Sequence, residues 1–128
     1  MADSQLSPGT VVTASYKSGE YIGELVDLYP PRVAVVKILA VSKHPEQGDL
    51  HHPGQVDVPL FHQRRALSYE EKASVPLSTV RPYEGDIPKY EASLRKAVEE
   101  AIVERKNDSS EWGQRALAEL ETLRSEYF

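Results

Sequence analysis

The chain has no cysteine, and this absence excludes several kinds of chemistry. Without a thiol there can be no disulfide, no thiolate nucleophile, no cysteine-ligated zinc and no thioether-linked lipid anchor. A reducing compartment is therefore permitted.

A long hydrophobic run is also missing. The longest apolar stretch, residues 33–41, is interrupted by Lys37, whereas a membrane helix needs about 18 or more apolar residues. The N-terminal residues have neither the basic region nor the apolar region of a signal peptide. We therefore expect a cytoplasmic protein with no membrane insertion.

Basic charge is not in excess in either half of the chain. The sequence has 15 Lys and Arg against 20 Asp and Glu, a net charge of -5, and residues 1–87 and 88–128 are both acidic. Because nonspecific nucleic-acid affinity comes from neutralising phosphates with Lys and Arg, this balance disfavours a nucleic-acid binder. Anionic membrane surfaces are disfavoured for the same reason.

The first third of the sequence has strand patterns. Alternating apolar and polar residues predict a half-buried strand over residues 10–16, followed by a short turn and a second strand over residues 21–28. A third strand, residues 32–42, is apolar on both faces. This pattern indicates either burial on both faces or a strongly curved strand, and it suits a small barrel.

Residues 43–62 have no sustained periodicity and are rich in Gly, Pro, Asp, His and Gln, so we expect a long loop. Loops of this length inside a compact domain are usually functional or mobile. Two further short strands are predicted at residues 66–69 and 79–81, with an irregular or single-turn segment over residues 70–75 between them.

From Asp86 the apolar residues recur at spacings of three and four, which predicts a helix with Asp86 as its N-cap and Pro88 in its first turn. Residues 107–110 end this helix. Asp108 with Glu111 three residues later resembles a capping box and predicts a second amphipathic helix that runs to the C-terminus.

These patterns predict an α+β fold with two parts. Residues 1–85 form a small barrel that carries the long loop 43–62, and residues 86–128 form a two-helix subdomain packed on it. Trp112 and Tyr90 lie on the apolar stripes of the helices, so we expect them where the helical hairpin docks onto the barrel.

All four histidines lie in the nineteen residues from His44 to His62. Zinc needs three or four converging His, Asp or Glu ligands, but adjacent His51 and His52 would point in opposite directions in an extended loop. We therefore expect no metal and no cofactor. A metal-binding or metal-dependent catalytic site in this loop remains the alternative.

The sequence contains no nucleophile elbow, no phosphate-cradling Gly-rich loop and no distinctive carboxylate pair, so we expect a protein without enzymatic activity. The pair Arg64-Arg65 could clamp a phosphate or a carboxylate, but we favour a solvated strand edge. Phe61 is either an aromatic anchor for a partner or a residue that pins the loop to the core. The candidate residues for partner binding or loop shaping are Asp49, His51, His52, Phe61, His62, Arg64 and Arg65.

Residues 10–25 look like the opening of an SH3-like barrel. The more specific segments are residues 44–53, 57–67, 80–85, 110–112 and 126–128. Together they resemble the kinase-associated protein B family of sporulating Bacillus and its relatives, over about residues 8 to 128.

This resemblance implies an SH3-like barrel followed by a C-terminal helical hairpin. It also implies a non-enzymatic accessory protein associated with a sensor histidine kinase, or another protein of the phosphorelay that initiates sporulation. The family has been labelled a lipoprotein, but this chain has no cysteine to acylate. We therefore expect protein contacts on the cytoplasmic side of the membrane, and the oligomeric state stays open.

Overall fold

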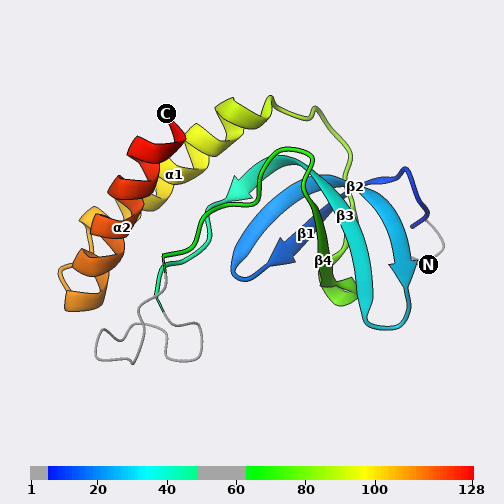
Figure 1. Ribbon diagram of the computed structural model, residues 1–128, viewed down its shortest axis with the longest axis horizontal. Helices are drawn as coiled ribbons and strands as arrows, with labels where there is room; N and C mark the ends of the chain where they lie inside the picture. The colour runs from blue at the N-terminus through cyan, green and yellow to red at the C-terminus, as the bar shows by residue number, and fades with distance from the viewer. Residues whose placement is uncertain (1–5, 49–62) are drawn as a thin grey trace.

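Five antiparallel strands form one sheet, and two helices cover it at one end (Figure 1). The computed structural model describes residues 6–48 and 63–128. The strand order is β4-β3-β2-β1-β5. The strands are β1 (Val11–Tyr16), β2 (Gly19–Tyr29), β3 (Val33–Lys43), β4 (Lys72–Pro76) and β5 (Arg81–Pro82), with a 3-10 turn, η2 (Leu77–Thr79), before β5. The helices α1 (Tyr90–Lys106) and α2 (Glu111–Tyr127) follow, which confirms the α+β class.

The ribbon of β2 and β3 is strongly curved. Its register shifts at three places, between Glu20 and Tyr21, between Ile22 and Gly23, and between Leu25 and Asp27. Such irregularities bend a strand and increase its twist. Burial alternates along β3, so curvature, and not burial on both faces, explains its apolar pattern. In the part of the chain that the structure describes, β4 and β5 do not pair with each other, so the sheet is broadly SH3-like without closing into a barrel.

The strand predicted at residues 66–69 is wrong, and so is the irregular segment predicted at 70–75. The chain turns at Glu70, which has a positive φ of 65°, and β4 then pairs with β3. Residues 66 and 67 bond their backbone groups to tyrosine hydroxyls. The alternation of buried Ala73 and Val75 was the signal for β4.

Both predicted helix starts are also wrong. Residue Ile87 precedes a proline and is therefore kept from helical geometry, so α1 begins at Tyr90 with Lys89 as N-cap. At α2 the cap is Ser110, whose Oγ accepts from the N–H of Gly113 at 3.0 Å, while Asp108 accepts from the Ser110 N–H. Within residues 6–48 and 63–128, no helix combines the length and the hydropathy needed to cross a membrane.

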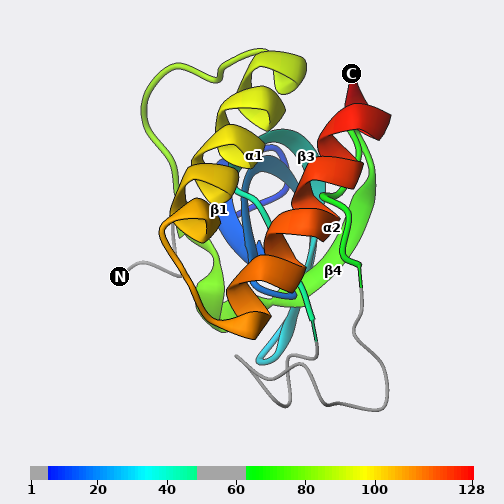
Figure 2. The same ribbon diagram turned by 90° about the vertical axis from the view of Figure 1, so that its left-hand side faces the viewer.

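Helix α1 packs on β3, and α2 lies beside α1 (Figure 2). Leu94 and Ala97 of α1 belong to the same buried cluster as the sheet residues. Buried Ser93 adds a polar tie, because its Oγ accepts from the N–H of Val41 at 2.9 Å. The division of the chain at residue 85 stays a prediction. In the described residues, one apolar core includes residues from both sides of this position.

Candidate functional site

Two adjoining segments, residues 44–48 and 63–67, flank residues 49–62 in the sequence, and we call them the loop base. The loop base lies at the junction between the sheet and the helices (Figure 1). Neither segment is helix or strand, so its backbone groups need other partners where they are buried.

One buried side chain ties the two segments of the loop base together. Gln47 is only 3% exposed. Its Nε2 donates to the carbonyl oxygens of Pro45 and Arg64, both at 3.0 Å, and its Oε1 accepts from the N–H of Arg64 at 2.8 Å. The Gln47 amide therefore acts as a strand partner would, with one donor and one acceptor on the same residue.

Three tyrosine hydroxyls bind the second segment of the loop base. Tyr127 of α2 accepts from the N–H of Ala66 at 2.9 Å, and Tyr21 of β2 accepts from the N–H of Leu67 at 3.2 Å. Tyr90 of α1 donates to the Leu67 carbonyl. Burial raises the pKa of both Tyr21 and Tyr90 to about 12, so these hydroxyls stay neutral. The sheet and both helices thus fix this segment jointly.

His44 is a buried member of the same network. Its Nδ1 lies 2.9 Å from the Pro45 carbonyl oxygen, which can only accept, so Nδ1 carries the proton. Its Nε2 lies 2.8 Å from the Tyr127 hydroxyl and accepts from it. Burial lowers the pKa of His44, and the bond to Pro45 opposes this only in part. His44 is therefore a neutral structural residue.

The lowered pKa of His44 predicts a loss of stability in acid. Below about pH 6.5 the unfolded chain binds a proton at this residue that the folded chain excludes. We therefore expect the free energy of unfolding to decrease as the pH falls below about 6.5, and His44 to add no pH dependence above it. Urea unfolding monitored by circular dichroism between about pH 5 and pH 8 measures this effect.

The matched variant is His44→Gln, which removes the titrating group and leaves the other histidines in place. Its free energy of unfolding should vary less across the same pH range than that of the wild type. Equal slopes in the two proteins would show that His44 is not excluded from protonation in the folded state.

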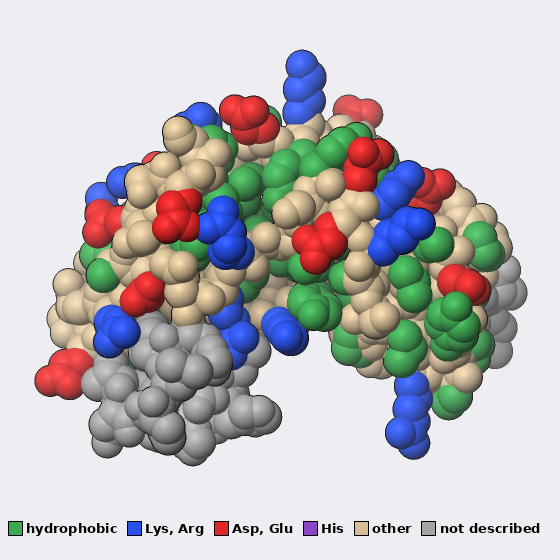
Figure 3. Space-filling model, viewed as in Figure 1, with side chains coloured by type: hydrophobic (Ala, Val, Ile, Leu, Met, Phe, Trp, Pro, Cys, Tyr) green, Lys and Arg blue, Asp and Glu red, His purple; other side chains and the backbone are tan. Residues whose placement is uncertain are grey.

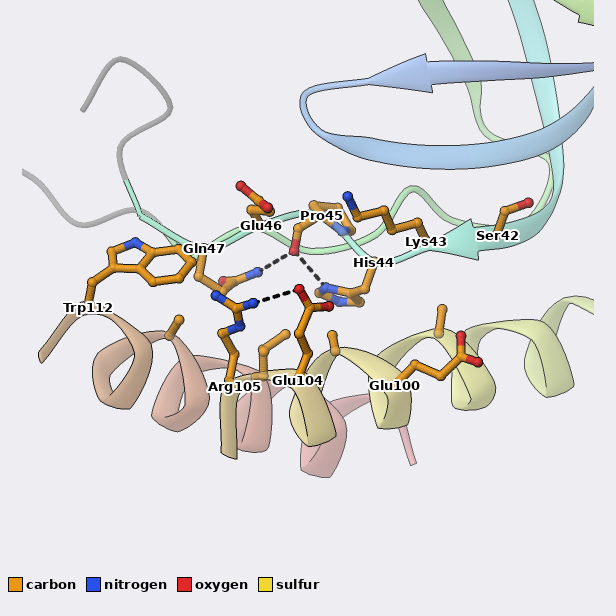
Figure 4. Close-up of a pocket in the computed structure, with 14 residues that line it drawn as sticks. Ser42, Lys43, His44, Pro45, Glu46, Gln47, Glu100, Glu104, Arg105 and Trp112 are labelled. Atoms are coloured by element: carbon orange, nitrogen blue, oxygen red, sulfur yellow. Dashed lines mark hydrogen bonds and ion pairs between the residues drawn. The ribbon is translucent and has the colours of Figure 1, made fainter. Parts of the chain in front are cut away.

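A groove of about 190 Å³ lies between residues 42–47 and the two helices (Figure 4). Its helical wall is apolar in part, with Ala97 and Ala101 from α1 and Ala116 and Leu120 from α2, and α1 also contributes the charged residues Glu100, Glu104 and Arg105. Figure 4 shows His44 and Gln47 on the opposite wall. The groove can accept an apolar side chain from a partner. Both ring nitrogens of His44 are already hydrogen-bonded, so His44 can transfer a proton only after one of these bonds is broken.

Trp112 stands at one end of this groove, facing Gln47 (Figure 4). The guanidinium of Arg105 lies over its ring, 4.7 Å from the centroid, and is itself held by Glu104 at 2.7 Å and Asp108 at 3.5 Å. Trp112 is half-buried. Of the two residues expected to dock the helices onto the sheet, Tyr90 does so through its bond to Leu67. Trp112 keeps part of its surface exposed to solvent.

The predicted site residues have different outcomes. Asp49, His51, His52, Phe61 and His62 lie outside the residues that the structure describes. The strand 66–69 that Arg64 and Arg65 were expected to flank is not formed, so the two arginines do not lie at a strand edge there.

The two arginines lie in different surroundings. Arg65 forms an ion pair with Glu126, and its guanidinium lies 5.2 Å from the Tyr127 ring centroid. Arg64 is half-buried, and its Nε is buried.

Sequence reasoning missed the residues that hold the loop base, chiefly Gln47, Tyr21 and Tyr127. A buried tyrosine usually needs a partner for its hydroxyl, and this general rule was the available signal. It could not identify the partner, because Tyr127 and Ala66 are 61 residues apart in the chain.

The metal alternative gains no support from the described residues. Within residues 6–48 and 63–128 no group of three or more His, Asp or Glu side chains is placed to hold a metal ion. His44, the one described histidine of the stretch, uses both ring nitrogens in hydrogen bonds.

Comparison with known proteins gives consistent results. A family model described as "Kinase associated protein B" matches residues 16–128. The chain is 46% identical over 125 residues to "Kinase-associated lipoprotein B" of Bacillus subtilis (strain 168), covering 98% of this chain and 97% of that protein. It also matches the crystal structure of kinase-associated protein B from Bacillus cereus, with 36% identity, a TM-score of 0.80, and coverage of 96% of this chain and 98% of the other. The chain belongs to the kinase-associated protein B family.

Proposed function

We propose that this protein is a non-enzymatic accessory protein that contacts a sensor histidine kinase, or another protein of the sporulation phosphorelay. The family name and the names of its relatives support an association with a kinase. We place it in the cytoplasm, recruited to the inner face of the membrane through its partner. The partner is the source of any membrane association in this proposal.

The observation that carries this proposal is the half-buried Trp112 at the end of an apolar groove, with Arg105 stacked on its ring. Tryptophan and arginine are enriched among the residues that dominate binding energy at protein interfaces. Trp112 retains solvent-accessible surface that a partner can cover. The groove, at about 190 Å³, has the size for an inserted side chain and not for a whole helix.

The charges around the groove favour a particular partner segment. Three carboxylates line it, those of Glu46, Glu100 and Glu104. The cations are fewer, and one of them, Arg105, is already paired with Glu104 and stacked on Trp112. A complementary segment would insert an apolar side chain flanked by Lys or Arg. Asp49, His51, His52, Phe61 and His62 stay candidate partner-binding residues in this proposal.

Replacing Trp112 with alanine is expected to weaken binding to the cytoplasmic part of a sporulation sensor kinase at least about tenfold, because the variant loses the main anchor. Isothermal titration calorimetry with the purified kinase fragment measures the change. If the wild type itself shows no binding at protein concentrations of about tens of micromolar, direct contact with this kinase is excluded.

The matched control is Tyr29→Ala. Tyr29 is also an exposed aromatic residue, 56% exposed, but it lies at the end of β2 next to Pro30 and away from the helices. This variant should bind as the wild type does. A similar loss of affinity in both variants would show that the groove is not the contact surface, as would full binding by the Trp112 variant.

A further inference from the structure

A second cavity, of about 210 Å³, lies on the sheet side of the loop base. Among the described residues, three cations line it together with two tyrosines, a proline and a glutamine, and no carboxylate does. These residues are Tyr16, Lys17, Tyr21, Pro45, Gln63, Arg64 and Arg65. In a protein with a net charge of -5, this composition is a local reversal of charge.

Arg64 is held in place in a way that leaves a donor unused. Gln47 bonds both its N–H and its carbonyl, so the backbone of Arg64 is fixed. The side-chain Nε is buried and has no hydrogen-bond partner in the described part of the chain. Leaving a buried donor unpaired costs free energy, and the cost is larger for a charged group than for an ordinary one. Arg64 also lines the cavity, so an anion bound there meets a side chain whose hydrogen-bonding capacity is not fully used.

Lys17 is brought to the same cavity by a strained turn. Lys17 and Ser18 form the two-residue turn between β1 and β2, and both have positive φ, 45° and 70°. Non-glycine residues adopt this geometry at a cost. The Ser18 Oγ accepts from the N–H of Glu46 at 2.9 Å, which pins the turn against the loop base. In Figure 3, Lys and Arg side chains lie beside the hollow at the lower middle of the molecule.

We propose that this cavity binds a phosphate group. Glu126 neutralises Arg65, so Lys17 and Arg64 leave an excess of two positive charges; neither forms an ion pair with another described residue. A phosphate monoester carries a charge of about -1.5 to -2 at pH 7, and an arginine fork matches its oxygens better than a single ammonium does. The group can be free phosphate or the phosphate of a modified side chain. This site does not depend on the proposed contact with a kinase.

The test is a titration of the full chain with inorganic phosphate at low ionic strength, followed by chemical shifts of the backbone amides. We expect saturable shifts at residues 16–21, 46–47 and 63–66. Arg64→Gln should weaken the affinity at least about tenfold, because it removes the fork and one charge. Lys17→Gln, at an exposed position, should weaken it as well without affecting the fold.

The matched control is Arg32→Gln, an identical change at an exposed arginine near the start of β3, which should bind phosphate as the wild type does. A second titration with O-phosphoserine separates the sources: tighter binding than phosphate indicates a phosphorylated side chain, and equal binding indicates the free ion. Shifts without saturation, or an equal loss in Arg32→Gln and Arg64→Gln, would overturn the proposal.

Discussion

Replacing Gly23 with alanine is expected to lower the free energy of unfolding by about 3 kcal/mol, at the upper end of typical overpacking costs. Gly23 is buried in β2, next to one of the register shifts against β3. A Cβ atom here would lie 2.4 Å from Cγ1 of Val36 and 2.5 Å from the backbone oxygen of Lys37. The carbonyl belongs to a paired strand and cannot move alone, so the two central strands would have to separate.

Urea unfolding followed by circular dichroism measures this loss, provided that the slope with urea stays the same. Val36→Ala in the same background separates the two clashes. It removes the contact with Cγ1 but not the one with the Lys37 carbonyl, so the double variant should be more stable than the sum of the single effects. Additive losses would show that Val36 is not the obstacle, and a loss below about 0.5 kcal/mol would contradict the close approach altogether.

The strands before residue 43 could be predicted because local patterns determine them. Alternation of apolar and polar residues indicated β1, and the second strand predicted over residues 21–28 lies within β2. The curvature of β3 was one of two interpretations, and the sequence could not choose between them. The choice depends on which residue of β2 lies opposite each residue of β3, and pairing across strands leaves no local signal.

The errors after residue 62 have a common cause. Residues 66 and 67 have strand-like composition, but their backbone groups bond to tyrosine hydroxyls from β2, α1 and α2. Such long-range bonds compete with strand pairing and cannot be seen in a short window. The N-cap error at Asp108 is more local, since Asp108, Ser109 and Ser110 are all good capping residues, and only the geometry selects Ser110.

The site residues chosen from the sequence stay predictions. The described end of the histidine stretch lies in the loop base, where the sheet and the helices meet. In the described residues, the Gln47 amide and three tyrosine hydroxyls hold the loop base, and histidine contributes one side chain. One histidine, His44, is buried and neutral, and the groove and the phosphate cavity lie on either side of the loop base with Pro45 lining both.

Tyr127→Phe is the second change for which we expect a large effect, a loss of about 3 kcal/mol of unfolding free energy from the removal of one oxygen atom. The Tyr127 hydroxyl accepts from the N–H of Ala66 and donates to Nε2 of His44. Ala66 is 9% exposed and His44 is 2% exposed, so water cannot readily replace the hydroxyl. Phenylalanine would leave one buried donor and one buried acceptor unpaired.

The matched control is Tyr83→Phe, because the Tyr83 hydroxyl donates to the Asp86 carbonyl at 2.7 Å in an exposed position. Water can take its place there, so we expect a loss below about 0.5 kcal/mol. Urea unfolding of both variants gives the comparison, and hydrogen exchange at the Ala66 amide locates the effect, since this amide should exchange faster only in Tyr127→Phe. Equal losses in the two variants would mean that the hydroxyl of Tyr127 is solvated in the folded protein. A selective loss would instead establish that the last turn of α2 stabilises the loop base through the Tyr127 hydroxyl.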